Sequence, residues 1–394
     1  MPPAPPRVGL RPGKERRLLR GHPWVYEGEI EEIEGSPAPG EIVDVCDAHR
    51  NFRARGYFNP HSHIRVRVLS FEPEPIDEDF LRRRLRQAID RRSLFSIPSD
   101  AYRLIFSESD LLPGLIVDRY GPYLVIQFLT LGMEVLRDQV VALLVELLSP
   151  QGIYARNDLH VRELEGLPQE KGLLWGQVPD RIRMQEGNLF WWVDVKEGQK
   201  TGFFLDQRGN RLALRGLSQG RRALDCFCYS GAFSLQAAHF GAASVLGLDI
   251  SDSAIALAEE NARLNGFSER CRFRAANAFD DLRALRKQGE TFDLIVLDPP
   301  AFTKSKQSIG PALRGYKEIN LRALKLLDSG GLLLTCSCSY HLSPQIFLQM
   351  IEEAATDAGR RVHLLEFRTQ APDHPILMGV PETCYLKCAI LRVV

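Results

Sequence analysis

Hydrophobic and polar positions divide the chain into three blocks of different character. In the last block, residues 187–394, short apolar runs alternate with amphipathic stretches of helical length. This alternation is typical of a mostly parallel sheet with helices on both faces. The predicted strands are 222–227, 244–249, 272–275, 292–297, 331–336, 363–367 and 384–391. We therefore expect a doubly wound α/β domain, with one helix beginning at Ser343 and Pro344, a serine cap followed by proline.

The first two blocks predict smaller domains. Residues 1–72 carry strand-like runs punctuated by glycine and proline, and Ile64 to Val68 alternate in polarity as a half-buried strand does. The strands expected there are 24–33, 41–46, 52–58 and 64–69, which make a small β domain. Residues 73–186 predict a small α+β domain, whose expected elements are helices at 80–93 and 132–148, a hairpin of 115–117 with 123–129, and a strand at 152–155.

Composition and charge narrow the class of protein. The 394 residues are 44% apolar and 25% charged, which is typical of a soluble globular protein. No apolar run is long enough to span a membrane and the start does not resemble a signal peptide, so we expect a cytoplasmic protein. The 50 basic and 50 acidic residues cancel, so any surface for nucleic acid must be local. The basic clusters are 7–20, which His22, Trp24 and Tyr26 follow, and 82–92, which a solvated helix face also explains.

The cysteines give no metal-binding pattern. Eight are scattered along the chain, and four of them form the pairs Cys226/Cys228 and Cys336/Cys338. Zinc sites usually space their cysteines by two or more residues on turns. Both pairs instead end apolar, strand-like runs. The sequence therefore predicts no metal site, and a cytosolic setting argues against disulfides.

Three strand ends in the last block predict a site for a nucleoside cofactor. The first strand ends near Asp225, and a turn with the single Gly231 leads into a helix. A dinucleotide site uses three glycines to bring the backbone to a pyrophosphate, so a ligand without phosphates fits this turn better. The second strand ends in Asp249, whose carboxylate can accept hydrogen bonds from ribose hydroxyls. The third strand leads to Asn277 and Ala278, which can bind and pack on an adenine.

The next two strand ends carry residues for chemistry on a planar base. The fourth strand ends in Asp298, which is followed by Pro299, Pro300, Ala301 and Phe302. Two prolines make this turn rigid and leave its carbonyls free to accept from an amino group, and the aromatic ring can stack on a base. The fifth strand ends near Cys336 and Cys338. A thiolate that adds to carbon-6 of a pyrimidine makes carbon-5 nucleophilic enough to attack a methyl donor, although a cysteine can also be a small buried apolar residue.

At these residues the chain resembles the RlmI-type methyltransferases, which use S-adenosyl-L-methionine to make 5-methylcytosine in bacterial 23S ribosomal RNA. The resemblance covers nearly the whole chain. Residues 21–26, GHPWVY, resemble the opening of the family's RNA-binding PUA domain, a small β-barrel. The segments 198–208, 373–375 and 381–383 resemble a motif before the catalytic core and a C-terminal hairpin. The resemblance implies a PUA domain at 1–72, an α+β linker domain at 73–186 and a class I Rossmann-like methyltransferase domain at 187–394.

The resemblance also implies roles for individual residues. S-adenosyl-L-methionine would be bound by Asp225, Phe227, Ser230, Gly231, Asp249, Asn277, Ala278 and Asp298. Large-subunit ribosomal RNA would be bound by Pro299, Pro300, Phe302, Lys200 and Arg208. The family's cysteine lies in a Ser-Cys-Ser element, which favours Cys338 as the catalytic nucleophile, although the surroundings of Cys336 resemble those in other RNA cytosine-5 enzymes. Asp298 would bind the cytosine ring at N3.

Some features depart from the family or leave alternatives open. Asn277 stands where an acid is usual, and Pro300 and Ala301 stand where related cytosine-5 enzymes carry a second cysteine, so another group or water must remove the C5 proton. Residues 304–307 resemble either a flap that contacts RNA phosphates or an ordinary surface loop. The alternative functions are an exocyclic-amine methyltransferase acting on RNA or a small molecule, which needs no thiol, and a non-catalytic RNA-binding scaffold. A homodimer also stays open.

Overall fold

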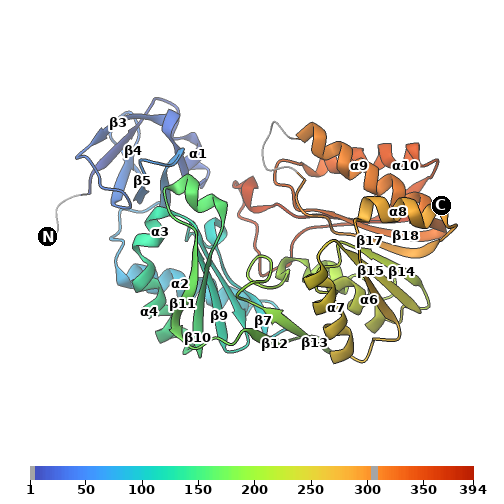
Figure 1. The fold of residues 1–394 in the computed structure, drawn as a ribbon. Coiled ribbons are helices and arrows are strands. Elements are labelled where there is room, and N and C mark those ends of the chain that lie inside the picture. Colours follow the sequence, from blue (N-terminus) through green and yellow to red (C-terminus); the bar gives the residue numbers. More distant parts are fainter. Residues whose placement is uncertain (1–4, 303–308) are drawn as a thin grey trace. The chain divides into compact units, whose positions relative to one another are not determined.

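The computed structural model describes residues 5–302 and 309–394 and contains two compact units (Figure 1). One unit holds residues 1–184, 193–205 and 372–383, and the other holds 185–192, 206–371 and 384–394. The chain therefore crosses between the units more than once. Segment 372–383, which is late in the sequence, belongs to the unit that contains the N-terminal strands.

The N-terminal part of the first unit is a sheet with the strand order β2-β6-β5-β4-β1-β3. Its strands are β1 (Arg7–Leu10), β2 (Trp24–Tyr26), β3 (Ile30–Glu34), β4 (Ile42–Cys46), β5 (Phe52–Phe58) and β6 (Ile64–Ser70), with the short helices α1 (Arg16–Leu19) and η1 (Glu27–Glu29) between them. Strands β1 and β4 pair in parallel, and Val8, Val45 and Val66 lie in the apolar core. The predicted small β domain is confirmed, although the expected strand 24–33 is split into β2 and β3.

The same unit contains a second sheet, with the order β11-β10-β9-β8-β7. Its strands are β7 (Ala101–Phe106), β8 (Leu115–Tyr120), β9 (Tyr123–Phe128), β10 (Gly152–Asn157) and β11 (Glu170–Gly176), with helices α2 (Glu78–Arg92), α3 (Leu131–Val135), α4 (Arg137–Leu148), η2 (Ser107–Asp110) and η3 (His160–Glu165). The predicted hairpin is confirmed, because Tyr120 and Tyr123 are paired across the β8–β9 turn. The expected helix 132–148 is two helices, because Leu136 departs from helical backbone angles. Strands β12 (Arg181–Glu186) and β13 (Leu189–Asp194) form a separate ribbon.

Acidic residues compensate much of the basic cluster on α2. Arg82 forms ion pairs with Glu78 and Glu146, at 2.6 and 3.1 Å. Arg92 is buried and donates to both oxygens of Asp110 at 2.7 Å. These arginines are therefore occupied within the fold, and Arg92 is buried rather than on the solvated helix face that the simpler interpretation gives it.

The second unit is built on a sheet with the order β16-β15-β14-β17-β18-β20-β19 in the part of the chain that the structure describes. Its strands are β14 (Arg222–Cys226), β15 (Ser244–Asp249), β16 (Cys271–Ala275), β17 (Phe292–Leu297), β18 (Leu327–Ser337), β19 (Val362–Arg368) and β20 (Lys387–Val393). Its helices are η4 (Leu205–Gln207), α5 (Arg208–Leu212), α6 (Ala232–His239), α7 (Asp252–Leu264), α8 (Ala278–Lys287), α9 (Ile309–Leu326) and α10 (Pro344–Asp357). The short helix η6 (Pro381–Thr383), which precedes β20 in the chain, belongs to the first unit. Among the described strands of this sheet, β14 to β18 are paired in parallel, and β20 pairs antiparallel with both β18 and β19, so the predicted mostly parallel α/β fold is confirmed.

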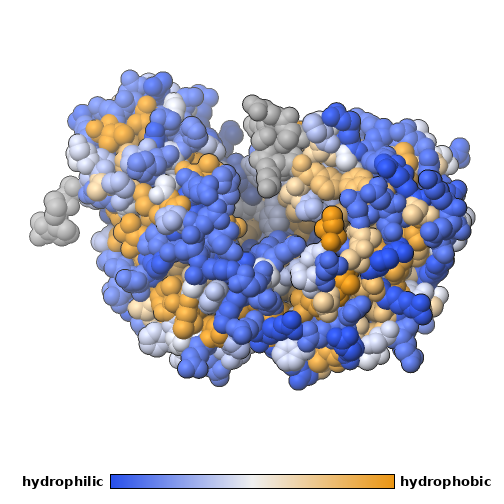
Figure 2. Space-filling view, in the orientation of Figure 1, coloured by the Kyte–Doolittle hydropathy of each residue, from blue (hydrophilic) through white to orange (hydrophobic). Residues whose placement is uncertain are grey.

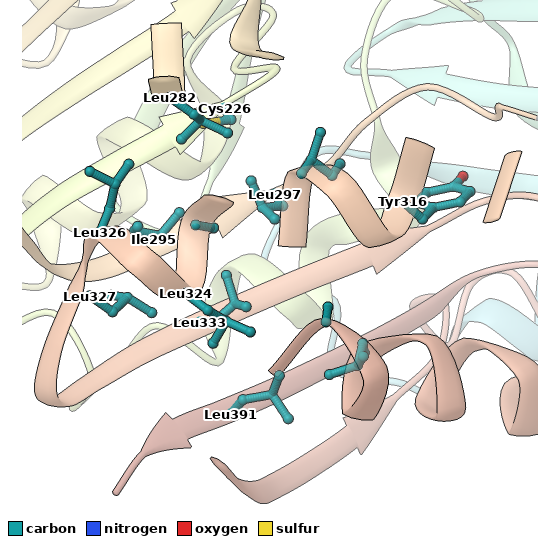
Figure 3. Close-up of a cluster of buried hydrophobic side chains, with 14 of the residues drawn as sticks. Cys226, Leu282, Ile295, Leu297, Tyr316, Leu324, Leu326, Leu327, Leu333 and Leu391 are labelled. Carbon is teal, nitrogen blue, oxygen red and sulfur yellow. The ribbon is translucent and has the colours of Figure 1, made fainter. Parts of the chain in front are cut away.

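The core of this unit lies between the sheet and helices α8, α9 and α10. Leu297, Leu324 and Leu333 are fully buried members of it (Figure 3). Parallel strands covered on both faces are apolar along their whole length, and this is why they appear in the sequence as continuous apolar runs. Helix α10 begins as predicted, with the Ser343 side chain accepting from the backbone of Ile346.

Apolar residues on the surface occur in small groups among hydrophilic ones on the face that Figure 2 shows. The most exposed of the large apolar side chains include Leu94, Ile250 and Met378, at 76%, 74% and 85% exposure. Among the helices of the described residues, none combines the length and hydropathy that a membrane-spanning helix needs.

Candidate active site

Most of the predicted site residues gather at one edge of the sheet in the second unit. Strands β16, β15, β14, β17 and β18 are parallel neighbours, so their carboxyl ends lie at the same edge. The chain leaves β14 towards β15 on one side, and β17 lies on its other side. Such a switch of direction is where ligands of open α/β sheets bind. Asp225, Asp249 and Asp298 all lie at or just beyond the ends of these strands.

The turn after β14 has an unusual backbone conformation. Phe227 and Tyr229 have φ angles of 68° and 46°, in the left-handed region that side chains other than glycine rarely adopt. Gly231 follows with φ 80°, and a Cβ there would lie 3.0 to 3.2 Å from the side chains of Leu235, Phe273 and Ala258. Glycine is therefore required at 231 by both conformation and space. Strained backbone of this kind is concentrated at ligand sites.

Two buried polar atoms beside this turn have no partner within the described protein. They are Oδ1 of Asp225 and Oγ of Ser230. The other oxygen of Asp225 accepts from Ser234 Oγ at 2.6 Å. Because an unpaired buried polar group is costly, these atoms indicate a polar ligand group at the end of β14. An ammonium and a carboxylate, the two groups at the methionine end of S-adenosyl-L-methionine, fit such a pair.

Burial makes Asp225 a titratable group near neutrality. Removal of the carboxylate from water raises its pKa to about 7, the Ser234 hydrogen bond opposes that rise, and the nearby Asp298 and Asp249 carboxylates add to it. The carboxyl is therefore poised between its neutral and charged forms. A ligand ammonium would favour the charged form.

The residues predicted to bind ribose and adenine end the next two strands. Asp249 accepts from the backbone N–H groups of Tyr229 and Ser251, at 2.9 and 3.0 Å, so its carboxylate also connects the β14 and β15 loops. Asn277 is exposed and uses its side-chain oxygen to cap α8, accepting from Phe279 N at 2.9 Å. Ala278 is buried in the first turn of that helix. Ile250, directly after Asp249, is an exposed apolar residue.

Asp298 is positioned by Gln207, a residue to which the sequence analysis gave no individual role. Gln207 Nε2 donates to Asp298 Oδ1 at 2.8 Å, and Gln207 in turn accepts from Asn210 Nδ2 at 2.6 Å. This chain of hydrogen bonds fixes the direction of the carboxylate. Gln207 lies in the family-like segment 198–208, which was the available sequence signal.

Arg208, which we expected to bind RNA, is instead buried in an ion-pair cluster. Its Nε lies 3.1 Å from Glu186 Oε2, and Arg211 pairs with the same carboxylate at 2.7 Å. The arginines keep the pKa of the buried Glu186 below its usual range, against the effect of burial. The cluster anchors α5 and with it Gln207, so we assign Arg208 to the support of the site. Lys200, the other expected RNA-binding cation, lies in the first unit with its ammonium over the Phe204 ring.

The double-proline turn leaves the sheet beside Asp298. Pro299 is buried and Pro300 is exposed. Phe302, expected to stack on a base, packs on Tyr316 and Phe279, with ring centroids 4.5 and 6.0 Å away. Segment 304–307, the expected flap, lies outside the described residues.

The two cysteines at the end of β18 have different environments. Cys336 is fully buried, lies opposite Cys388 of β20, and burial raises its pKa well above the usual range. Cys338 lies beyond the end of β18 and is half-buried. Among the described residues, no three His, Cys, Asp or Glu side chains are grouped to hold a metal ion.

Comparison with known proteins assigns the fold and the site to a class. The model of the family described as S-adenosylmethionine-dependent methyltransferase matches residues 171–392, and that of a PUA-like domain matches residues 8–71. The solved structure of a protein described as a SAM-dependent methyltransferase from Streptococcus mutans matches with a TM-score of 0.84 over 98% of this chain and all of that one, at 21% identity. The chain is an S-adenosylmethionine-dependent methyltransferase, and the predicted cofactor is confirmed.

Curated relatives narrow this class to one family. The chain is 44% identical to ribosomal RNA large subunit methyltransferase I of Tolumonas auensis, over 98% of this chain and 99% of the relative. It is 42% identical to the protein of that name from Serratia proteamaculans, with the same coverage. The chain belongs to the ribosomal RNA large subunit methyltransferase I family, which confirms the RlmI-type resemblance.

Proposed function

We propose that this chain methylates carbon-5 of cytosine in large-subunit ribosomal RNA, with the thiolate of Cys338 as nucleophile. The ribosomal substrate is supported by the relatives, which carry that substrate in their name and align with almost the whole chain. The PUA-like segment at residues 8–71 supports an RNA substrate independently of the catalytic unit.

The observation that carries the choice of nucleophile is the contrast between the two cysteines. A sulfur that adds to a base must be reachable by that base, and its thiolate must be attainable near neutral pH. Cys336 is fully buried beside Cys388, and burial disfavours its thiolate. Cys338 is half-buried at the catalytic edge of the sheet and meets the requirement of access.

The reaction follows from the chemistry of the base. The sulfur of Cys338 bonds to carbon-6, and the electrons of the 5,6 double bond make carbon-5 nucleophilic. S-adenosyl-L-methionine, when bound, supplies the methyl group that carbon-5 receives. Carbon-5 then gives its proton to a base, the double bond re-forms, and the sulfur leaves as a thiolate. A base stacked in a helix hides carbon-6, so the target cytosine must be unpaired or flipped out.

The remaining site residues bind and orient the two substrates. Asp298, fixed by Gln207, accepts from the protonated N3 of cytosine and so favours the activated ring. The orphaned atoms of Asp225 and Ser230 receive the methionine end of the cofactor. Asp249 binds the ribose hydroxyls, and Asn277 and Ala278 bind the adenine. The side-chain oxygen of Asn277 caps α8, so its amide N–H groups are the ones that donate to the base.

The test is methyl transfer to large-subunit ribosomal RNA by the wild type and by Cys338→Ala and Cys336→Ala, with the modified nucleoside identified by mass. We expect 5-methylcytosine, abolished in Cys338→Ala and retained in Cys336→Ala. Cys338→Ala should still bind S-adenosylhomocysteine, which separates a lost nucleophile from a lost fold. Activity in both variants, or an amine-methylated product, would replace the thiolate mechanism with the exocyclic-amine alternative.

A further inference from the structure

A buried lysine lies at the catalytic edge and takes no part in the site described so far. Lys387, the first residue of β20, is 1% exposed. Its ammonium donates to the carbonyl oxygens of Ser339 and Tyr385, at 2.6 and 2.8 Å. Of its three N–H donors, the third has no hydrogen-bond partner among the described residues. A buried ammonium with a spare donor requires a nearby anion to compensate it.

The reversed direction of β20 explains why this lysine is at the site. Strand β20 pairs antiparallel with β18, and Lys387 is opposite Ser337. Its beginning therefore lies at the edge where the parallel strands end. The carbonyl that it binds belongs to Ser339, the residue directly after Cys338. Lys387 thus fixes the backbone that carries the proposed nucleophile.

The ionisable groups around this ammonium are thiols rather than carboxylates. Among the described residues no acid forms an ion pair with Lys387, and the groups whose negative charge would act on it are Cys338 and Cys384. Tyr316 of α9 also faces this cluster, since its hydroxyl lies 2.8 Å from Ser339 Oγ and it interacts with the charge of Cys338. A tyrosine is neutral near pH 7, so Lys387 is the positive charge that these elements present to the thiol.

We propose that Lys387 is a positioning residue that stabilises the thiolate of Cys338 for the reaction proposed above. Burial lowers the pKa of Lys387 to about 8, and ionised thiols at Cys338 and Cys384 oppose that fall. The interaction is mutual, so the ammonium lowers the pKa of the Cys338 thiol. A cation beside a cysteine commonly brings its pKa below the ordinary value of about 8.5. For an ordinary thiol, a one-unit fall in pKa raises the thiolate fraction at pH 7 about eight-fold.

Alkylation by iodoacetamide tests this without RNA or cofactor. The rate at Cys338 is measured against pH by peptide mass, in Cys384→Ser protein so that a single half-exposed thiol of the cluster reacts. We expect an apparent thiol pKa below about 8.5. Lys387→Met, of similar length but uncharged, should move the profile to higher pH and slow alkylation at pH 7 about eight-fold or more. Lys387→Arg keeps the charge and should restore much of the reactivity.

The outcomes separate this inference from the proposed function. A wild-type profile at or above the ordinary thiol value overturns it, as does an unchanged profile in a folded Lys387→Met protein. If circular dichroism shows that Lys387→Met does not fold, the alkylation profiles of the wild type and of Lys387→Arg decide whether the lysine stabilises the thiolate. A Cys338 thiol that is acidic in the wild type but dispensable for methyl transfer would leave the lysine's effect standing and would defeat the proposed nucleophile.

Discussion

The protonation of Asp225 should control cofactor affinity across neutral pH. With a pKa raised to about 7, this carboxyl is charged in only a minority of molecules at acidic pH. The charged fraction is about 9% at pH 6 and about 91% at pH 8, by the ordinary titration relation. If the ligand ammonium binds only the carboxylate, S-adenosylhomocysteine should bind about tenfold more weakly at pH 6 than at pH 8.

Calorimetric titration of S-adenosylhomocysteine at half-unit steps from pH 5.5 to 8.5 measures this directly. Asp225→Asn should bind S-adenosylhomocysteine weakly, and its affinity should lack the step, the change in affinity near pH 7 that we expect in the wild type. Ser234→Ala is the matched probe, because the Ser234 hydrogen bond lowers the pKa of Asp225 and its removal should move the step to higher pH. Equal affinity at pH 6 and pH 8 in the wild type, or a step that survives in Asp225→Asn, would refute the assignment of this carboxylate to the ammonium.

Three further changes test the supports of the site. Gln207→Ala should reduce the rate of methyl transfer about tenfold in a single-turnover assay, because the hydrogen bond that orients Asp298 is lost. An unchanged rate would contradict that role. Gly231→Ala should destabilise the protein by at least about 1–3 kcal/mol in urea unfolding, because its φ is positive and neighbours crowd the site. Glu186→Gln should lower the free energy of unfolding by about 3–5 kcal/mol in the same measurement, since Arg208 and Arg211 lose a buried counter-charge. A change near zero would show that solvent reaches the two arginines.

The sequence predicted the parts of the fold whose signal is local. Strands β15 and β17 begin and end where their apolar runs do, because parallel strands covered on both faces are apolar throughout. The start of α10 was readable from one cap and one proline. Strands β7, β11 and β12 were not predicted, since their runs are short or polar.

The same distinction applies to the site. The place of acids at the ends of apolar strands, such as Asp225 and Asp249, was predictable because strand direction alone brings them to one edge. Gln207 and Lys387 were not, since their partners lie 91 and 48 residues away in the sequence. The burial of Arg208 was also not predictable, because sequence alone does not distinguish a surface arginine from one paired with a buried acid.

The place of β20 in the sheet sets an order for how the protein is made. This strand, residues 387–393, lies between β18 and β19, both of which precede it in the chain. While the ribosome synthesises the protein, β18 and β19 emerge with their pairing edges open, and neither can be completed until β20 enters between them. Open strand edges invite pairing with other chains. The catalytic half of the molecule therefore stays unfinished, and exposed to misassembly, until residues 387–393 have been translated.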